Sequence, residues 1–253
     1  MSEHRDLILD QFTRQATPFA TAPSIKDEGA LKLVVEFSGA GPDDTVLDVA
    51  CGPGLLACAF ARVARHVTGI DITPAMLDRA RALQTEQGLT NVTWRPGDVL
   101  PLPWPDASFE VVCSRFAFHH FQDPLAVLRE KRRICRPGGH VVVVDSTPAA
   151  AKADAFNAME KIRDPSHVRA LPLEEHEALF AAAGLPRPRR TTYRLESDLE
   201  SLIARSFPAP GGADEMRRRF VASLEDDALD IQTRRDGDLI RYGFPVAVLV
   251  ADV

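Results

Sequence analysis

One acidic residue and two glycines follow a short apolar run, in a pattern that suits a positively charged ligand. Residues 45–49 have the β-branched and aliphatic composition of a strand that is buried on both faces. Asp48 lies near the end of this run, and Gly52 and Gly54 follow in a turn whose backbone can bend sharply and approach a ligand closely. The helix expected from Leu55 onward directs free backbone N–H groups at the space over the turn.

Two classes of ligand fit this turn. The run from Gly52 to Ala57 matches the G-x-G-x-x-G/A fingerprint of dinucleotide-binding proteins. Asp48, however, lies four positions before the first glycine, where its charge would repel a pyrophosphate and attract a cationic group. S-adenosylmethionine carries a sulfonium and an ammonium group and no phosphate. The pattern therefore favours this cofactor, with an NAD-type oxidoreductase as the alternative.

A second acidic residue, Asp71, ends the next predicted strand, over residues 67–71. It follows Gly52 at close to the roughly 20-residue spacing of an acidic side chain that binds ribose hydroxyls. A carboxylate accepts two hydrogen bonds from a vicinal diol, which is why this position favours Asp or Glu. The alternative is a helix cap, although Thr73 and Pro74 already provide a cap and a first turn.

Further motifs give the chain a family resemblance. Gly97-Asp98 follows a third predicted strand, and the turn Arg136–Gly139 precedes a β-branched strand over residues 140–145. With the glycine turn and Asp71 in this order, the sequence resembles the class I S-adenosylmethionine-dependent methyltransferases. The resemblance extends over about residues 40–150. The later run "DPSHVR" is similar to the ubiquinone/menaquinone-biosynthesis (methyltransferase type 11) branch of that family.

The resemblance implies an α/β fold with a helical lid and a helical cap. The expected core is a three-layer αβα sandwich around a seven-stranded, mostly parallel, Rossmann-like sheet whose last strand is antiparallel. The expected divisions are an N-terminal helical lid over residues 1–38, a methyltransferase domain over residues 39–253, a cap insertion over about residues 148–175 and further helices over about residues 196–225.

Residues 1–38 are predicted to contain two amphipathic helices. The first covers residues 6–17 and is expected to end at Pro18, and the second begins at Ser24 and reaches about Phe37. Either both helices simply cover the sheet, or the first closes over a substrate pocket with Phe12 as a substrate contact.

The resemblance also implies most of the cofactor contacts. Asp48 would orient the methionine end of S-adenosylmethionine, the glycines would make room for it, and Asp98 would bind the adenine amino group. Ile72 and the backbone N–H of Val99 would contact the adenine ring. The predicted cofactor-binding residues are Asp48, Gly52, Gly54, Asp71, Ile72, Asp98, Val99 and, at the end of the fourth predicted strand, Ser114.

The run from Arg115 to Phe121 follows that fourth strand, beside the expected methyl donor. An imidazole there can take a proton from a substrate hydroxyl or amine near neutral pH, and His119 is the predicted catalytic base. Alternatively, its histidines hydrogen-bond the backbone and shape the loop. The predicted acceptor contacts are Phe12, Arg115, His120, His167 and Arg169. For Arg115, the alternative is that it braces its own loop. For His167 and Arg169, the alternative is that they brace the cap insertion.

Composition limits the partners. The 253 residues carry a net charge of −6 with a pI near 5.7, which argues against nucleic acid. The basic stretch over residues 129–133 is therefore interpreted as a solvated helix face. No apolar run is long enough for a membrane span, and the polar first residues do not resemble a secretory signal. The four cysteines form no CxxC pair, so a reduced cytoplasmic protein without a metal site is expected.

The predicted function is methyl transfer from S-adenosylmethionine to a small molecule through a carbon, oxygen or nitrogen nucleophile. A protein that binds the cofactor without methylating anything is a further alternative. The sequence does not indicate an oligomeric state.

Overall fold

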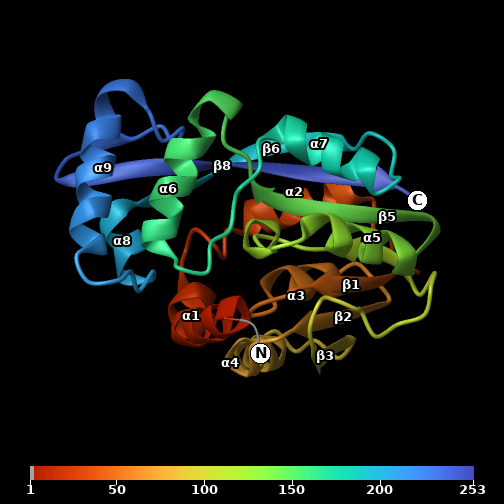
Figure 1. Ribbon diagram of the computed structural model, residues 1–253. Helices are drawn as coiled ribbons and strands as arrows, with labels where there is room; N and C mark the ends of the chain where they lie inside the picture. Colours follow the sequence, from red (N-terminus) through yellow and green to blue (C-terminus); the bar gives the residue numbers. More distant parts are fainter. Residues whose placement is uncertain (1–2) are drawn as a thin grey trace.

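An eight-stranded sheet forms the centre of the computed structural model, which describes residues 3–253 (Figure 1). The strand order is β3-β2-β1-β4-β5-β8-β6, and β7 pairs with β8. Strands β1 to β5 pair in parallel, whereas β8 is antiparallel to both β5 and β6. The predicted Rossmann-like sheet with its antiparallel last strand is therefore confirmed. The strands are β1 (Thr45–Val49), β2 (His66–Asp71), β3 (Val92–Pro96), β4 (Phe109–Cys113), β5 (Cys135–Ser146), β6 (Arg189–Asp198), β7 (Arg234–Asp236) and β8 (Leu239–Asp252).

The short strand β7 is the one difference from the predicted strand count of seven. It forms a hairpin with β8, in which Asp236 pairs with Leu239 across the two-residue loop of Gly237 and Asp238. Gly237 has a φ of +59°, the left-handed conformation that such tight hairpin turns need. The sequence pattern did not reveal β7 because its three residues are all exposed and charged.

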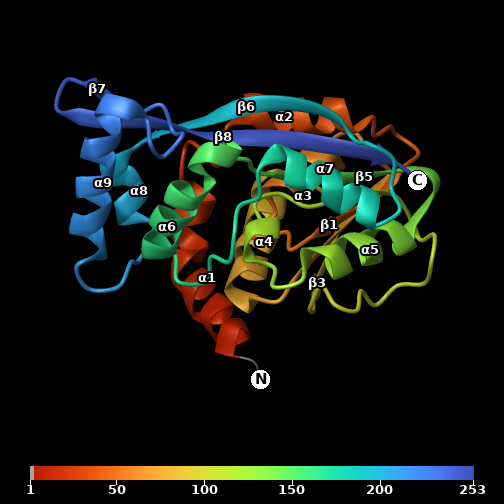
Figure 2. The ribbon, with the colours of Figure 1, turned by 45° about the horizontal axis from the view of Figure 1, so that its top comes forward.

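Helices cover both faces of the sheet (Figures 1 and 2). Side chains of β1 alternate between these faces, as the period of a strand requires. Val46 packs in a core cluster with Val34 of α2, and Leu47 packs in the opposite cluster with Leu128 of α5 and Phe180 of α7. The helices are α1 (Glu3–Thr21), α2 (Glu28–Ser38), α3 (Leu55–Ala61), α4 (Pro74–Glu86), α5 (Pro124–Ile134), α6 (Ala153–Arg163), α7 (Leu173–Ala182), α8 (Leu199–Ala204) and α9 (Gly212–Asp226), with 3₁₀ turns η1 (Phe118–His120) and η2 (Ala150–Lys152).

The N-terminal helices differ from their predicted bounds. Helix α1 continues through Pro18 to Thr21, although proline lacks the N–H that would bond the carbonyl four residues earlier. Packing on both sides of the proline holds the helix, because Gln15 is buried before it and Phe19 packs against the hydrophobic core after it. Helix α2 begins at Glu28 rather than at Ser24, since the Asp27 carboxylate accepts the N–H of Ala30 at 2.9 Å and caps the helix there.

Helices α6, α8 and α9 gather beside one end of the sheet, where β6 and β8 extend beyond the other strands (Figure 2). Their contact with the sheet is aromatic: Phe220 of α9 meets Tyr242 of β8 at 5.4 Å between ring centroids, and Phe156 of α6 meets Phe244 at 5.5 Å. Helix α1 lies between this helical group and α4 (Figure 2). None of the helices within residues 3–253 is long and apolar enough to cross a membrane. All four cysteines are buried free thiols.

Candidate active site

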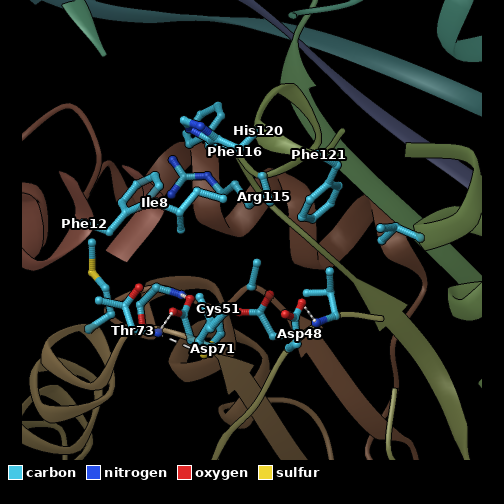
Figure 3. A pocket seen from close by; sticks show the side chains of 18 of the residues that line it. Ile8, Phe12, Asp48, Cys51, Asp71, Thr73, Arg115, Phe116, His120 and Phe121 are labelled. Carbon is cyan, nitrogen blue, oxygen red and sulfur yellow. Dashed lines mark hydrogen bonds between the residues drawn. The ribbon is translucent and has the colours of Figure 1, made fainter. Parts of the chain in front are cut away.

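A cavity of about 350 Å³ opens at the carboxyl ends of the parallel strands, beneath helix α1. This edge is where open α/β sheets bind their ligands. In Figure 3 the side chains of Asp48 and Asp71 lie along one wall, and those of Phe12, Arg115 and His120 lie along the other. A second cavity of about 60 Å³ adjoins it, and both cavities are lined by Phe12, Phe19, Phe116 and His120.

The two glycines of the turn have different roles. Both have positive φ, +52° at Gly52 and +79° at Gly54. A Cβ at Gly52 would meet nothing within 4 Å, and this residue lines the large cavity. A Cβ at Gly54 would come within 2.5 Å of the Trp94 ring and 2.9 Å of Ala80. Gly54 therefore makes room for Trp94, and its predicted contact with the cofactor stays a prediction.

Paired alanine substitutions should separate these roles. We expect G54A to lower the free energy of unfolding by about 2–4 kcal/mol, from backbone strain plus the clash with Trp94. G52A should cost only the strain, about 1–2 kcal/mol, but should weaken cofactor binding because its methyl group enters the cavity. Urea unfolding and calorimetric titration with S-adenosylhomocysteine measure both effects. Equal stability of the two variants would contradict the role assigned to Trp94.

Asp48 presents an unpaired carboxylate to the large cavity. The residue is 1% exposed, and neither carboxylate oxygen has a hydrogen bond of good geometry within residues 3–253, only weak ones from the Cys113 thiol and the Ala57 N–H. Burial raises the pKa of Asp48 to about 7, although the nearby Lys131 charge opposes the shift. A buried acceptor without a partner is costly, so this wall is suited to a ligand that brings a cation or hydrogen-bond donors.

Asp71 joins the glycine turn to the start of α4. One carboxylate oxygen accepts the N–H of Gly52 and the other accepts the N–H of Thr73, both at 2.8 Å. The alternative was a helix cap, but the N-cap of α4 is Thr73, and Asp71 instead braces the backbone just before the helix. Each oxygen keeps a second lone pair, and the residue lines the cavity, so a ribose diol can still bind there. Burial raises the pKa of Asp71, and these backbone N–H groups oppose the shift.

Ile72, Asp98 and Val99 line the same cavity. The Asp98 carboxylate accepts a hydrogen bond from Arg5 of α1 at 2.6 Å and another from the N–H of Val99 at 2.7 Å. The Val99 N–H, predicted to reach an adenine nitrogen, is therefore occupied by Asp98. Binding of adenine as predicted requires the Asp98 side chain to rotate away from Val99.

Ser114 does not line either cavity, and its predicted cofactor contact is not found. Its hydroxyl accepts a hydrogen bond from Lys131 Nζ at 2.7 Å, and its backbone N–H and C=O pair with Val142 and Val144 of β5. The residue is 1% exposed. All its polar groups are therefore engaged within the sheet and with α5.

Lys131 is a buried cation, so the interpretation of residues 129–133 as a solvated helix face is wrong for this residue. Its Nζ donates to Ser114 Oγ and to the carbonyl of Val142, at 2.7 Å each. Burial lowers the pKa of Lys131 to about 7, while the Asp48 charge opposes the shift. The spacing could have revealed it, because Lys131 lies midway between the buried Leu128 and Ile134 on one helix face.

Replacing this lysine by methionine should change how stability depends on pH. A Lys pKa near 7 in the folded state and near 10.5 in the unfolded state means that the unfolded chain binds more protons between these values. Stability of the native protein should therefore gain up to a few kcal/mol from this group between pH 7 and 10. We expect K131M to lose that gain in urea unfolding at pH 7, 8.5 and 10. K32M, which removes an exposed lysine, should keep it, and the same slope in K131M would contradict the assignment.

His119 lines the second cavity and forms a buried pair with Asp145. Its Nδ1 lies 2.5 Å from one Asp145 carboxylate oxygen, and its backbone N–H donates to the other at 3.2 Å. Burial alone would lower the pKa of His119, but the Asp145 charge and hydrogen bond outweigh it and raise the pKa. Asp145 ends the predicted fifth strand, so its position at the site edge was visible in the sequence, although its role was not.

His120 lies between the two cavities. Its Nδ1 contacts the carbonyl of Ser166 at 3.1 Å, and the Phe12 ring meets it edge-on at 4.9 Å between centroids. His4 Nε2 of α1 lies 2.8 Å from the His120 carbonyl, which indicates the tautomer that donates there. Burial and the neighbouring His119 lower the pKa of His120 to about 4, so this imidazole is neutral at pH 7.

His167 and Arg169 line neither cavity, so their predicted substrate contacts are not found. His167 Nε2 contacts Asn157 at 2.7 Å, and Arg169 forms an exposed two-pronged ion pair with Glu175. The alternative, that the segment braces the chain, is the better description. The backbone N–H groups of Val168 and Arg169 both donate to the carbonyl of His119, at 2.8 and 3.0 Å. The segment therefore holds His119 in place.

Arg115 lines the large cavity, as predicted for a substrate contact, and also braces the chain. Its Nη1 donates to the carbonyl of Ile25 at 3.1 Å, and its guanidinium stacks on Phe116 at 4.4 Å from the ring centroid. Two further wall residues, His4 and Ile8, come from α1 and were not singled out in the sequence, since only the fold brings that helix over the strand ends.

Comparisons with known proteins identify relatives of this architecture. A family profile described as a methyltransferase domain matches residues 47–143. A Bacillus subtilis (strain 168) protein named "uncharacterized methyltransferase YcgJ" is 33% identical over 223 residues, covering 85% of this chain and 86% of that protein. The crystal structure of YcgJ superposes with a TM-score of 0.80 at 26% identity, covering 88% of this chain and 97% of that one.

Two further relatives have names that describe the methyl transfer. The 27-O-demethylrifamycin SV methyltransferase of Amycolatopsis mediterranei (strain S699) is 33% identical over 171 residues, which covers 63% of this chain and 61% of that protein. The ubiquinone/menaquinone biosynthesis C-methyltransferase UbiE of Bdellovibrio bacteriovorus is 34% identical over 154 residues, which covers 57% of this chain and 65% of that protein.

Proposed function

Because this chain belongs to the S-adenosylmethionine-dependent methyltransferase family, we propose that its large cavity binds the cofactor and that the second cavity receives a small-molecule methyl acceptor. The observation that carries the proposal is the unpaired carboxylate of Asp48 beside the open cradle at Gly52. A sulfonium or ammonium group satisfies this carboxylate, and the cradle admits a ligand close to the backbone.

Charge in the large cavity disfavours the dinucleotide alternative. Four carboxylates line it, from Asp48, Asp71, Asp98 and Asp123, against the two guanidinium groups of Arg5 and Arg115. Arg5 is paired with Asp98. A pyrophosphate over the glycine turn would face Asp48 and Asp71. The comparisons likewise give no support to an NAD-type oxidoreductase.

The main task of the protein in this reaction would be to align the methyl donor with the acceptor. When bound, S-adenosylmethionine supplies a methyl group on a sulfonium, which is a good leaving group. Asp48 and Gly52 would hold its methionine end, and Asp71, Ile72 and Asp98 would hold the ribose and adenine. Positioning of two reactants can supply about 7–11 kcal/mol of barrier reduction in favourable cases.

His119 would act as the base when the acceptor nucleophile carries a proton. Its Nδ1 faces Asp145, so this nitrogen carries the ring proton and Nε2 is free to accept one from the acceptor. Asp145 then stabilises the imidazolium that forms, in the way that a buried carboxylate orients a catalytic histidine. Asp145 is thus proposed as a positioning residue.

Helix α1 would close the cofactor cavity as a lid. It contacts the cavity rim through His4 and Arg5, and it contacts the helical group through two buried glutamines. Gln11 donates to the carbonyl of Ser206 at 2.5 Å, and Gln15 donates to Asp164 at 3.3 Å. Apolar contacts hold it as well, since Phe12 packs on His120 and Ala16 is buried, so opening would have to separate both kinds of contact.

The acceptor is proposed to be a small organic molecule. One relative is named for the acceptor 27-O-demethylrifamycin SV, and another is named as a C-methyltransferase of ubiquinone and menaquinone biosynthesis. The aromatic residues shared by both cavities suit an acceptor with an apolar body.

Two measurements test the function. Calorimetry should show binding of S-adenosylmethionine and no binding of NADH. Incubation with a metabolite extract and S-adenosylmethionine carrying a labelled methyl group should then give a product that gains one methyl group by mass spectrometry. Binding of NADH alone would refute the cofactor assignment, and binding without any methylated product across extracts would favour the non-methylating alternative.

A further inference from the structure

Arg115 has one open edge of its guanidinium group. Nε and Nη2, the two nitrogens that share this edge, are buried and have no hydrogen-bond partner within residues 3–253. The third nitrogen, Nη1, is held by the Ile25 carbonyl, and the Phe116 ring supports the face of the group. The side chain is therefore fixed in place with two parallel donors unused.

No carboxylate within the described part of the chain forms a salt bridge with this guanidinium, unlike that of Arg5. The hydroxyl of Tyr193 on β6 is also buried and has no hydrogen bond of good geometry. Burial raises the pKa of Tyr193, and the charge of Arg115 and a weak hydrogen bond from it oppose the shift, so the hydroxyl stays neutral at pH 7. A neutral hydroxyl does not balance the charge of a buried guanidinium, so an anion is the missing partner.

Arg115 lines the large cavity on the side that borders the second cavity. Phe116, on which it stacks, lines both cavities, and Ile25, to which it is tethered, lines the second. Figure 3 places the guanidinium near Ile8 and Phe12, across the cavity from Asp48. On this wall the guanidinium therefore has apolar and aromatic neighbours, whereas the aspartates lie opposite or at the rim.

The geometry points to a carboxylate ligand. A planar guanidinium edge with two parallel N–H groups matches the two oxygens of a carboxylate. A dianionic phosphate is less suited, because Asp48, Asp71 and Asp98 line the same cavity. We propose that Arg115 anchors the methyl acceptor, and that this acceptor is an aromatic or aliphatic carboxylic acid. The inference rests on the proposed function, and the methionine carboxylate of the cofactor is the other source of the same chemistry.

Calorimetric titrations separate the two sources. S-adenosylhomocysteine carries the methionine-end carboxylate, and 5′-methylthioadenosine lacks that end. Both would be titrated into native protein, R115M and R115K. Benzoate and cinnamate, each paired with its neutral amide, would be titrated into protein saturated with S-adenosylhomocysteine. R95M is the matched control, since Arg95 also stacks on an aromatic ring, Trp104 at 5.4 Å, but lines neither cavity.

We expect native protein and R95M to bind at least one of these acids about tenfold more tightly than its amide, from a charge-assisted pair of hydrogen bonds. R115M should abolish that preference and leave both adenosine compounds unaffected, and R115K should restore part of it. Thermal unfolding confirms that the variants are folded without the Ile25 contact.

Three other results would contradict the assignment of Arg115 to the acceptor. Weaker binding of S-adenosylhomocysteine to R115M with unchanged 5′-methylthioadenosine would keep the anion anchor but assign it to the cofactor, refuting the acceptor assignment. No preference for acid over amide in native protein, together with unchanged S-adenosylhomocysteine binding by R115M, would overturn the anchor altogether. If native protein binds neither adenosine compound, the proposed function fails, and that failure is visible without any variant.

Discussion

H119A should lower kcat by roughly 10²- to 10⁴-fold on an acceptor whose nucleophile must lose a proton, the usual contribution of a positioned general base. The affinity for S-adenosylhomocysteine should not change, because His119 lines the second cavity and not the large one. Steady-state kinetics on the acceptor found in the extract screen, with calorimetry for the cofactor product, measures both quantities. H140A is the control, since His140 also pairs with an aspartate, Asp252 at 2.9 Å, but lines neither cavity.

The pH dependence gives an independent check on the same pair. The base must be neutral to accept a proton, and Asp145 raises the pKa of His119 above its ordinary value of 6.5. Activity of the native enzyme should therefore fall on the acid side of this raised pKa. D145N removes the charge, so its acid limb should move to lower pH while kcat drops. Full turnover in H119A, or an unmoved acid limb in D145N, would exclude His119 as the base.

The second large effect is expected at Asp71. D71A should weaken binding of S-adenosylhomocysteine by about 1–3 kcal/mol, because two hydrogen bonds to the ribose diol are lost. D78A is the control, because it removes the same charge from an exposed position. Asp78 lies on α4, where it pairs with Arg81. Calorimetry of the three proteins measures the difference.

Because Asp71 also accepts the N–H groups of Gly52 and Thr73, its loss can loosen the turn itself. An S-adenosylhomocysteine analogue without ribose hydroxyls separates the two contributions. Native protein should bind the analogue more weakly than the parent compound, whereas D71A should bind both alike. If D71A weakens both compounds by the same factor, Asp71 only braces the backbone and the ribose assignment is wrong.

The sequence was sufficient wherever function follows from a strand end. Parallel strands place their carboxyl ends on one edge of the sheet, so Asp48, Asp71 and Asp98 converge there once the strands are identified. The antiparallel β8 came from the family resemblance and not from the residues. The lining role of Arg115 also followed from its place directly after β4.

The roles of other residues could not be predicted from the sequence, because each depends on a partner that is distant along the chain. Gly54 is needed by the Trp94 ring of β3, which no local pattern reveals. Ser114 is engaged by Lys131, and Lys131 was misplaced because a charged run resembles a solvated surface even when one member lies on the buried face. His167 contacts Asn157 of α6, and this contact could not be predicted before the fold placed α6 beside it.

Strand β8 has a consequence for substrate selection. Its pairing with β5 ends near Val246, and the same strand continues without a break to Tyr242 and Phe244 among the cap helices. A hinge between the two halves would have to break this strand, so the helical group of α6, α8 and α9 is expected to move together with the sheet. If the second cavity receives the acceptor as proposed, it must then widen on the side of α1, because about 60 Å³ is too little for an aromatic acid.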